Sequence, residues 1–183
     1  MKEQSICWID VETTGKDCEK NVLLEVACLI TDLELNILDE SGYESVLWYP
    51  ESHLDELKSQ TVPFVVDMHT KTGLWDRLSQ GKMKHKVEAE LLEYVQTYIP
   101  EPQTARLGGN SITLDRNFIN KNLPGVGEHL SYRSVDVSTL SGLIQYWGPS
   151  EKMYRKKTVH SAMSDIRESI EELKFLRKHV SVS

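Results

Sequence analysis

Residues 5–15 read Ser-Ile-Cys-Trp-Ile-Asp-Val-Glu-Thr-Thr-Gly, a β-branched and aromatic run that ends in two alternating acids. The apolar part predicts a strand. Side chains two residues apart share one face of a strand, so Asp10 and Glu12 should lie about 7 Å apart at its end. Two like charges so placed repel each other unless a cation lies between them. The pair is a candidate metal site, although a single Asp-x-Glu is more often a solvated strand end.

Strand signals continue after this run and then alternate with helical ones. Apolar residues fill 23–33, an extended run follows at 45–49, and short strands are expected near 104–107 and 134–137. Strands that first occur together and then alternate with helices predict an α/β fold, a mixed five-stranded sheet flanked by helices.

Helical spacing is clearest in residues 87–98 and 162–176, where apolar residues mark one face. Ser138 or Thr139 is the expected cap of another helix. Residues 71–81 carry loop signals and are not expected to form a helix.

Length and composition indicate an ordinary globular protein. The 183 residues suffice for one domain spanning 1–183, with 39% hydrophobic and 27% charged residues, unlike a disordered chain. No apolar run approaches the roughly 20 residues of a membrane span, so neither a membrane anchor nor secretion is expected. Three cysteines without metal-ligand spacing indicate a reducing, cytoplasmic location, with Cys7 and Cys28 as small buried hydrophobes.

The net charge of −7 limits the kind of nucleic acid that the chain could bind. Tight binding to long nucleic acid relies on many basic contacts to phosphates and on counterion release. Any nucleic acid substrate should therefore be short, and no long duplex is expected as a partner.

Two further acidic positions are ambiguous when each is taken alone. Asp115 falls near the first turn of a predicted helix, where the helix dipole favours an acid without any metal. Asp165 has the same explanation at the start of the last helix, and His160 precedes it at the entry from a loop. The conjunction of a strand-end Asp-x-Glu, a mid-chain acid and His-x-x-x-x-Asp, in this order, favours chemistry.

Four blocks combine these acids with their neighbours. They are Trp-Ile-Asp-Val-Glu-Thr-Thr-Gly at 8–15, Gly-Asn-Ser at 109–111 with Asp-Arg-Asn-Phe at 115–118, Tyr-Arg-Ser-Val-Asp-Val-Ser-Thr-Leu at 132–140, and His-Ser-Ala-Met-Ser-Asp-Ile-Arg-Glu-Ser-Ile at 160–170. The chain resembles the DnaQ-like exonucleases of the DEDDh type and, within them, the oligoribonuclease family. The blocks run from the first strand to the last helix, so the resemblance covers nearly the whole chain.

The resemblance implies an RNase H-like fold, a homodimer, and two divalent cations, Mg²⁺ or Mn²⁺. It assigns Asp10, Glu12, Asp115 and Asp165 to metal binding and catalysis, and His160 to the general base that takes a proton from water. The implied reaction is 3′→5′ hydrolysis of very short single-stranded RNA to nucleoside 5′-monophosphates.

The same resemblance implies a binding site for the 5′ phosphate. It assigns Ser111, Arg133 and Ser138 to that site, with Tyr132 reaching across from a partner subunit. A guanidinium can hold a terminal phosphate through two parallel hydrogen bonds. Without the resemblance, Arg133 would be read as a surface ion pair and Ser138 as a helix cap.

The chain departs from the family pattern at the residues that wedge the terminal base. Lys16 stands where the family has a leucine, and Phe64, aligned back from His69, stands in for a tryptophan. A phenyl ring can stack on a base for roughly 1–3 kcal/mol, whereas Lys16 cannot replace an apolar wedge and is instead a candidate phosphate contact. Asn110 and His69 complete the predicted substrate-binding set.

Two alternatives remain open at this point. A DNA-directed proofreading or repair exonuclease is favoured by Asp-Val-Glu-Thr-Thr-Gly and opposed by the block at 132–139. A catalytically inactive, nucleic-acid-binding dimer would need the acids only as surface solvation.

Overall fold

The computed structural model describes residues 5–147, 154 and 161–178, which form a five-stranded sheet with helices around it. The strands are β1 (Ser5–Thr13), β2 (Leu23–Asp32), β3 (Tyr43–Val46), β4 (Arg106–Gly109) and β5 (Ser131–Asp136). Their order is β3-β2-β1-β4-β5, in which β1, β2 and β3 pair antiparallel whereas β1, β4 and β5 run parallel. The predicted mixed five-stranded sheet is confirmed.

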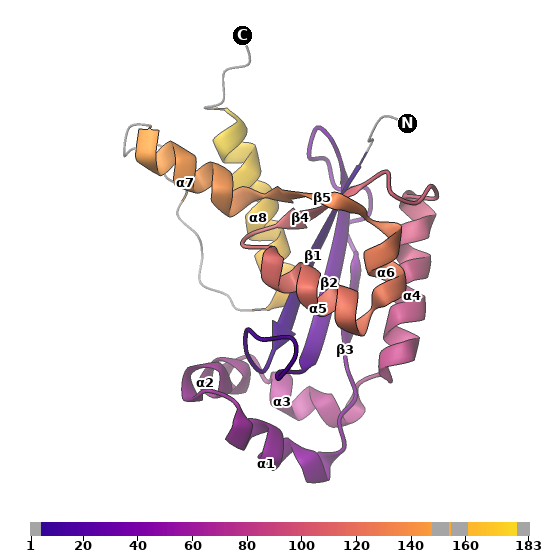
Figure 1. The fold of residues 1–183 in the computed structure, drawn as a ribbon, viewed down its shortest axis with the longest axis vertical. Helices are drawn as coiled ribbons and strands as arrows, with labels where there is room; N and C mark the ends of the chain where they lie inside the picture. The colour runs from indigo at the N-terminus through magenta and orange to yellow at the C-terminus, as the bar shows by residue number, and fades with distance from the viewer. Residues whose placement is uncertain (1–4, 148–153, 155–160, 179–183) are drawn as a thin grey trace.

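Helices cover both faces of the sheet and one of its ends (Figure 1). They are α1 (Glu51–Gln60), α2 (Pro63–Lys71), α3 (Leu74–Arg77), the 3-10 turn η1 (Leu78–Gln80), α4 (Lys84–Tyr98), α5 (Thr113–Asn122), α6 (Pro124–His129), α7 (Val137–Trp147) and α8 (Ala162–Arg177). The cores show that α4, α5 and α6 pack on one face and α8 on the other. None of the helices in the described part of the chain is long and apolar enough to cross a lipid bilayer.

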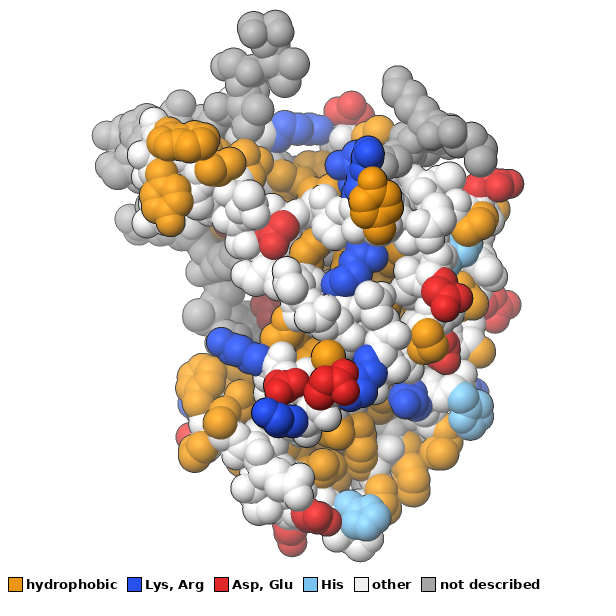
Figure 2. Space-filling model, in the orientation of Figure 1, with side chains coloured by type: hydrophobic (Ala, Val, Ile, Leu, Met, Phe, Trp, Pro, Cys, Tyr) orange, Lys and Arg blue, Asp and Glu red, His pale blue; other side chains and the backbone are white. Residues whose placement is uncertain are grey.

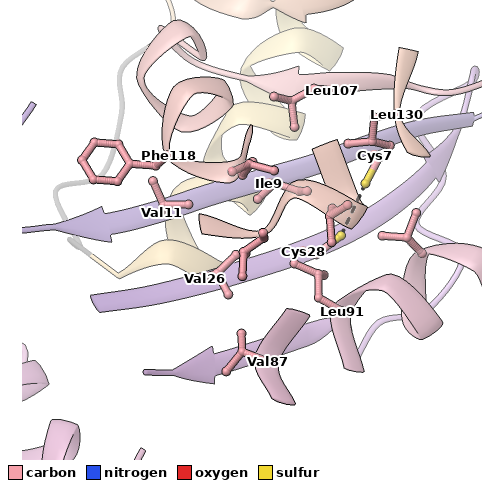
Figure 3. Close-up of a cluster of buried hydrophobic side chains, with 14 of the residues drawn as sticks. Cys7, Ile9, Val11, Val26, Cys28, Val87, Leu91, Leu107, Phe118 and Leu130 are labelled. Carbon is pink, nitrogen blue, oxygen red and sulfur yellow. Dashed lines mark hydrogen bonds between the residues drawn. The ribbon is translucent and has the colours of Figure 1, made fainter. Parts of the chain in front are cut away.

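The side chains of β1 alternate between the two faces of the sheet, and this places the two acids on the face that α8 covers. Cys7, Ile9 and Val11 point into the cluster under α4, α5 and α6 (Figure 3). Residues of the other parity, such as Trp8, pack against α8, and Asp10 and Glu12 continue that parity at the end of the strand. Cys7 is fully buried, as predicted, and its Sγ lies 3.6 Å from the Sγ of Cys28.

One predicted loop is in fact helical. Residues 71–81 contain α3 and η1, because Leu74, Trp75 and Leu78 bury themselves against Leu24 of β2. Each helix is too short to show a helical period in the sequence, so the prediction of a loop there was wrong.

The expected cap of α7 is also wrong. The helix follows β5 directly and begins at Val137, so Ser138 lies inside its first turn. The carboxylate of Asp136 takes the capping position, because its Oδ1 accepts hydrogen bonds from Ser138 N (3.0 Å) and Ser138 Oγ (2.6 Å).

Candidate metal centre and active site

Three carboxylates from distant parts of the chain meet at the end of β1. Asp10 and Glu12 come from the strand, and Asp165 comes from the first turn of α8, which packs on the same face. One oxygen from each of the three lies within 4.8 Å of the other two. The sequence expectation that Asp165 joins the Asp-x-Glu pair therefore agrees with the geometry.

Asp115 reaches the same strand end from the opposite face of the sheet. It lies in the first turn of α5, is only 5% exposed, and accepts a 3.0 Å hydrogen bond at Oδ1 from the backbone N–H of Val11. Because Val11 separates Asp10 from Glu12, this bond fixes Asp115 beside both of them.

Burial makes Glu12 and Asp115 costly in the charged form. The pKa of Glu12, 8% exposed, is raised to about 8, first by desolvation and then by the charges of Asp165, Glu25 and Asp115. Desolvation also raises the pKa of Asp115 to about 7, against the stabilising hydrogen bond from Val11. A hard dication with a preference for oxygen ligands would offset this repulsion, so the donor set fits Mg²⁺ or Mn²⁺.

Of the two histidines in the predicted site, the structure describes only one. His69 of α2 is buried, with Nε2 2.9 Å from the carbonyl oxygen of Thr13 and Nδ1 3.8 Å from Glu12 Oε2. In this arrangement it supports the end of β1, and its contact with substrate stays a prediction. His160 lies outside the described residues, just before Ser161, the N-cap residue of α8.

A second polar cluster joins the ends of β4 and β5. Asp136 Oδ1 accepts a 3.0 Å hydrogen bond from Ser111 N as well as the two bonds from Ser138. Ser111 holds a left-handed backbone with φ +55, which is strained for a residue other than glycine. Ser111 and Ser138, two predicted phosphate contacts, thus lie together. Sequence reasoning missed Asp136, although an Asp side chain often accepts a hydrogen bond from the backbone two residues further along the chain.

Two further predicted substrate contacts, Tyr132 and Arg133, lie in a bulge of β5. Arg106 of β4 pairs with Ser131, but the following residue, Leu107, pairs with Ser134. Tyr132 and Arg133 are therefore extra to the ladder, and such bulges can re-aim side chains next to functional sites.

Side-chain contacts hold this bulge in shape. Arg116 of α5 donates from Nη2 to the carbonyl oxygen of Arg133 (3.1 Å) and to Ser134 Oγ (3.0 Å). Tyr132 is 79% exposed, and Arg133 bonds its hydroxyl from Nε at 3.1 Å. The structure thus directs both side chains outward. Arg116 supports the bulge, a role that the sequence did not indicate.

The remaining predicted substrate contacts lie in different settings. Asn110 is tied to α8, since its Nδ2 lies 2.8 Å from Ser169 Oγ and 3.1 Å from Glu172 Oε2. Lys16 is exposed in the loop after β1, and Phe64 is exposed on α2. Their contacts with substrate stay predictions.

Strand order sets the separation of the two polar groups. β1, β4 and β5 are parallel neighbours, so their carboxyl ends meet at one edge of the sheet. The carboxylates follow β1 and the serines follow β4 and β5. Two strand spacings separate β1 from β5, which is roughly 10 Å.

Comparison with known families identifies the fold and its lineage. Residues 7–173 match the family model of the RNase_T exonucleases. The chain belongs to this exonuclease family. It is 40% identical over 177 residues to an oligoribonuclease of Francisella tularensis subsp. holarctica, a match that covers 96% of each chain. It is 39% identical to a probable oligoribonuclease of Schizosaccharomyces pombe, over 97% of this chain and 69% of that one. Within the exonucleases it belongs to the oligoribonucleases.

Solved structures show the same architecture. Exonuclease I from Methylocaldum szegediense superposes with a TM-score of 0.67 at 20% identity, over 96% of this chain and 40% of that one. Escherichia coli exonuclease I in complex with a dA16 oligonucleotide gives a TM-score of 0.66 at 15% identity, over 96% of this chain and 41% of that one. The chain thus spans about two fifths of these proteins, and the likeness establishes an RNase H-like fold.

Proposed function

We propose that the protein is a 3′→5′ exoribonuclease that hydrolyses very short single-stranded RNA to nucleoside 5′-monophosphates. The observation that carries the proposal is the meeting of Asp10, Glu12 and Asp165 at the end of β1. The oligoribonuclease relatives, similar over nearly the whole chain, support RNA as the substrate.

The four acids would hold two divalent cations, Mg²⁺ or Mn²⁺. Asp10, Glu12 and Asp165 supply oxygens from the α8 face, and Asp115 adds a carboxylate beside Val11. Cations bound there would supply Lewis acid chemistry, lowering the pKa of water and stabilising the departing 3′ oxygen.

Residues of the chain would accept the proton of the attacking water and bind the 5′ phosphate of the substrate. His160 takes the proton of the attacking water on a ring nitrogen, so it must be neutral, and activity should rise with pH as it loses its own proton. Arg133 binds the 5′ phosphate through two parallel hydrogen bonds, with Ser111 and Ser138 beside it. The roughly 10 Å between β1 and β5 then leaves room for only a short oligonucleotide between the two sites.

The surface of α7 supports a homodimer. Among its residues only Val137 is buried, while Tyr146 and Trp147 are largely exposed, the latter by 81%. Figure 2 shows hydrophobic side chains gathered over this helix. β5 beside it is an edge strand, which a second copy could cover. In such a dimer the exposed Tyr132 would reach the partner's site.

Free thiols support a cytoplasmic location. All three cysteines are unpaired, and two of them are buried. This arrangement fits a reducing compartment.

The test of the substrate is a time course on end-labelled RNA of two to ten nucleotides beside DNA of the same sequences. We expect loss of single 3′ nucleotides, with 5′-phosphorylated dinucleotides degraded fastest and Asp10→Ala inactive. Degradation of long single-stranded DNA as fast as a diribonucleotide would instead favour the DNA-directed alternative. A folded protein without activity in Mg²⁺ or Mn²⁺ would favour the alternative of a catalytically inactive, nucleic-acid-binding dimer.

The test of the dimer is light scattering after size exclusion. Trp147→Glu should shift the protein toward a monomer and slow dinucleotide hydrolysis, because Tyr132 of the partner would be lost from the site. Trp48→Glu, at another exposed tryptophan, is the matched control and should remain a dimer. A wild-type monomer would contradict this part of the proposal.

A further inference from the structure

The bulge of β5 lies on the surface of the molecule. Tyr132, Arg133 and Ser134 are all exposed, and β5 is an edge strand of the sheet. The pairing with β4 passes directly from Ser131 to Ser134, so the two residues between them are outside the ladder. Neither deep burial nor regular strand pairing therefore fixes the direction in which Arg133 points, and its polar contacts gain importance.

The guanidinium of Arg116 holds the bulge from α5. Its Nη2 lies 3.1 Å from the carbonyl oxygen of Arg133 and 3.0 Å from the hydroxyl oxygen of Ser134. This nitrogen carries two hydrogens, so it can donate to both oxygens at once. Hydrogen bonds from a charged donor are roughly twice as strong as neutral ones. The two bonds fix the peptide that follows Arg133, and with it the direction of that side chain.

The helix that carries Arg116 is itself firmly placed. Phe118 and Ile119 of α5 are buried in the core between the helix and the sheet. The residue before Arg116 is Asp115, which accepts its hydrogen bond from the backbone of Val11 in β1. The first turn of α5 therefore contacts β1 at the metal centre and β5 at the bulge, and it links the two polar groups through one rigid element.

We propose that Arg116 is a positioning residue that sets the preference for short substrates with a 5′ phosphate. It ties the bulge to the helix that carries Asp115, and so holds Arg133 at a fixed separation from the metal centre. Arg116 acts through Arg133 and does not itself bind the phosphate. The inference rests on the proposed function, since it assumes that Arg133 recognises the 5′ phosphate.

Variants can remove these bonds from either side. Arg116→Met keeps an unbranched apolar side chain and removes both bonds. Ser134→Ala removes one acceptor from the strand, and it tests the same contact if Arg116→Met does not fold. Arg167→Met is the matched control, because Arg167 of α8 also bonds one backbone and one side-chain oxygen, both of Glu40. Glu40 precedes β3, at the opposite edge of the sheet from β5.

The experiment measures binding of one diribonucleotide with and without a 5′ phosphate by calorimetry. All variants are made in the full chain with Asp10→Ala, so that no substrate is cleaved. The ratio of the two Kd values is the phosphate preference. We expect Arg116→Met to lower this preference about tenfold and Ser134→Ala about threefold, as for the loss of part of a charge-assisted contact. Arg167→Met should stay within about twofold of the parent protein. An unchanged preference in Arg116→Met, or an equal loss of affinity for both dinucleotides, would overturn the proposal.

A double-mutant cycle with Arg133→Met separates positioning from direct contact. If Arg116 acts through Arg133, Arg116→Met should change the phosphate preference less than about twofold once Arg133 is replaced. The same tenfold loss with and without Arg133 would show that Arg116 binds the phosphate itself, and would refute the positioning role. These readouts do not require nuclease activity. A wild type that binds the 5′-phosphorylated dinucleotide but cleaves no RNA would therefore refute the proposed function and leave this test intact.

Discussion

The metal centre and the edge formed by β5 and α7 are built in opposite ways. Glu12 and Asp115 of the metal centre are buried, and Asp115 is held by a hydrogen bond from the backbone of Val11. Tyr132 and Arg133 instead project from a bulge on an edge strand. Chemistry thus depends on the folded core, whereas selection of short substrates depends on a surface that can change without unfolding the protein. Substitutions in the two regions should have different substrate dependence.

The largest effect is expected at the buried region. Asp10→Asn should lower kcat on the order of 10³-fold or more on every RNA length, because it removes a ligand without changing the shape of the site. The measurement is single-turnover hydrolysis of RNA of several lengths. Asp55→Asn, on the exposed side of α1, is the control and should be fully active. A loss confined to dinucleotides would break the distinction between the two regions.

A smaller and selective effect is expected at the edge. Arg133→Met should lower kcat/KM for a 5′-phosphorylated dinucleotide about 30-fold, which corresponds to about 2 kcal/mol of charge-assisted hydrogen bonding. Substrates without a 5′ phosphate should change little. Arg133→Lys keeps the charge without the two parallel bonds, so its kcat/KM should lie between those of the wild type and Arg133→Met. An equal loss on both substrates would remove Arg133 from phosphate recognition.

Phe64 tests whether an exposed ring can take part in binding. Phe64→Ala should raise KM about tenfold if the ring stacks on a base, within the range for such contacts. Phe64→Trp retains an aromatic face and should bind at least as well as the wild type. Steady-state kinetics on a dinucleotide decide the point, and an unchanged KM in Phe64→Ala would show that the ring is not used.

The mildest expected effect is on stability. The folded-state pKa values of Glu12, about 8, and Asp115, about 7, lie above their ordinary values. Folding therefore favours their protonated forms, and the metal-free protein should lose stability as pH rises from about 4 to about 8. Mg²⁺ binds the ionised forms, so at 100-fold excess over Kd it should raise Tm by about 5–10 °C near pH 8 and by less near pH 5. Thermal unfolding with EDTA or Mg²⁺ measures this, and a larger shift at acid pH would contradict it.

The sequence predicted the buried region better than the edge. Period-two alternation placed Asp10 and Glu12 on one face, and helical spacing placed Asp165 in a first turn, because both periods are local. The β5 bulge was not foreseen, since it depends on pairing with β4 rather than on residues 131–134 themselves. Asp136 as the cap of α7 was missed because the expected strand extended one residue too far.

Long-range contacts were the other gap. The resemblance supplied the roles of Arg133, Ser111 and Ser138, but not the bond from Arg116 that shapes the bulge. Glu25 was visible as one charge in an apolar run, yet its ion-pair partner, Arg77 on α3, is far away in the chain. Such partners appear only when the packing of the helices is known.

The two extra residues of β5 have a consequence for how this protein could diversify. Side chains along a strand alternate with a period of two, so removing Tyr132 and Arg133 together would leave every later side chain on its present face. A single deletion would leave one extra residue and a bulge of different shape. A lineage could therefore gain or lose this pair in one step of six bases while keeping its catalytic scaffold, and a length-restricted enzyme and an unrestricted one could be close neighbours in sequence space.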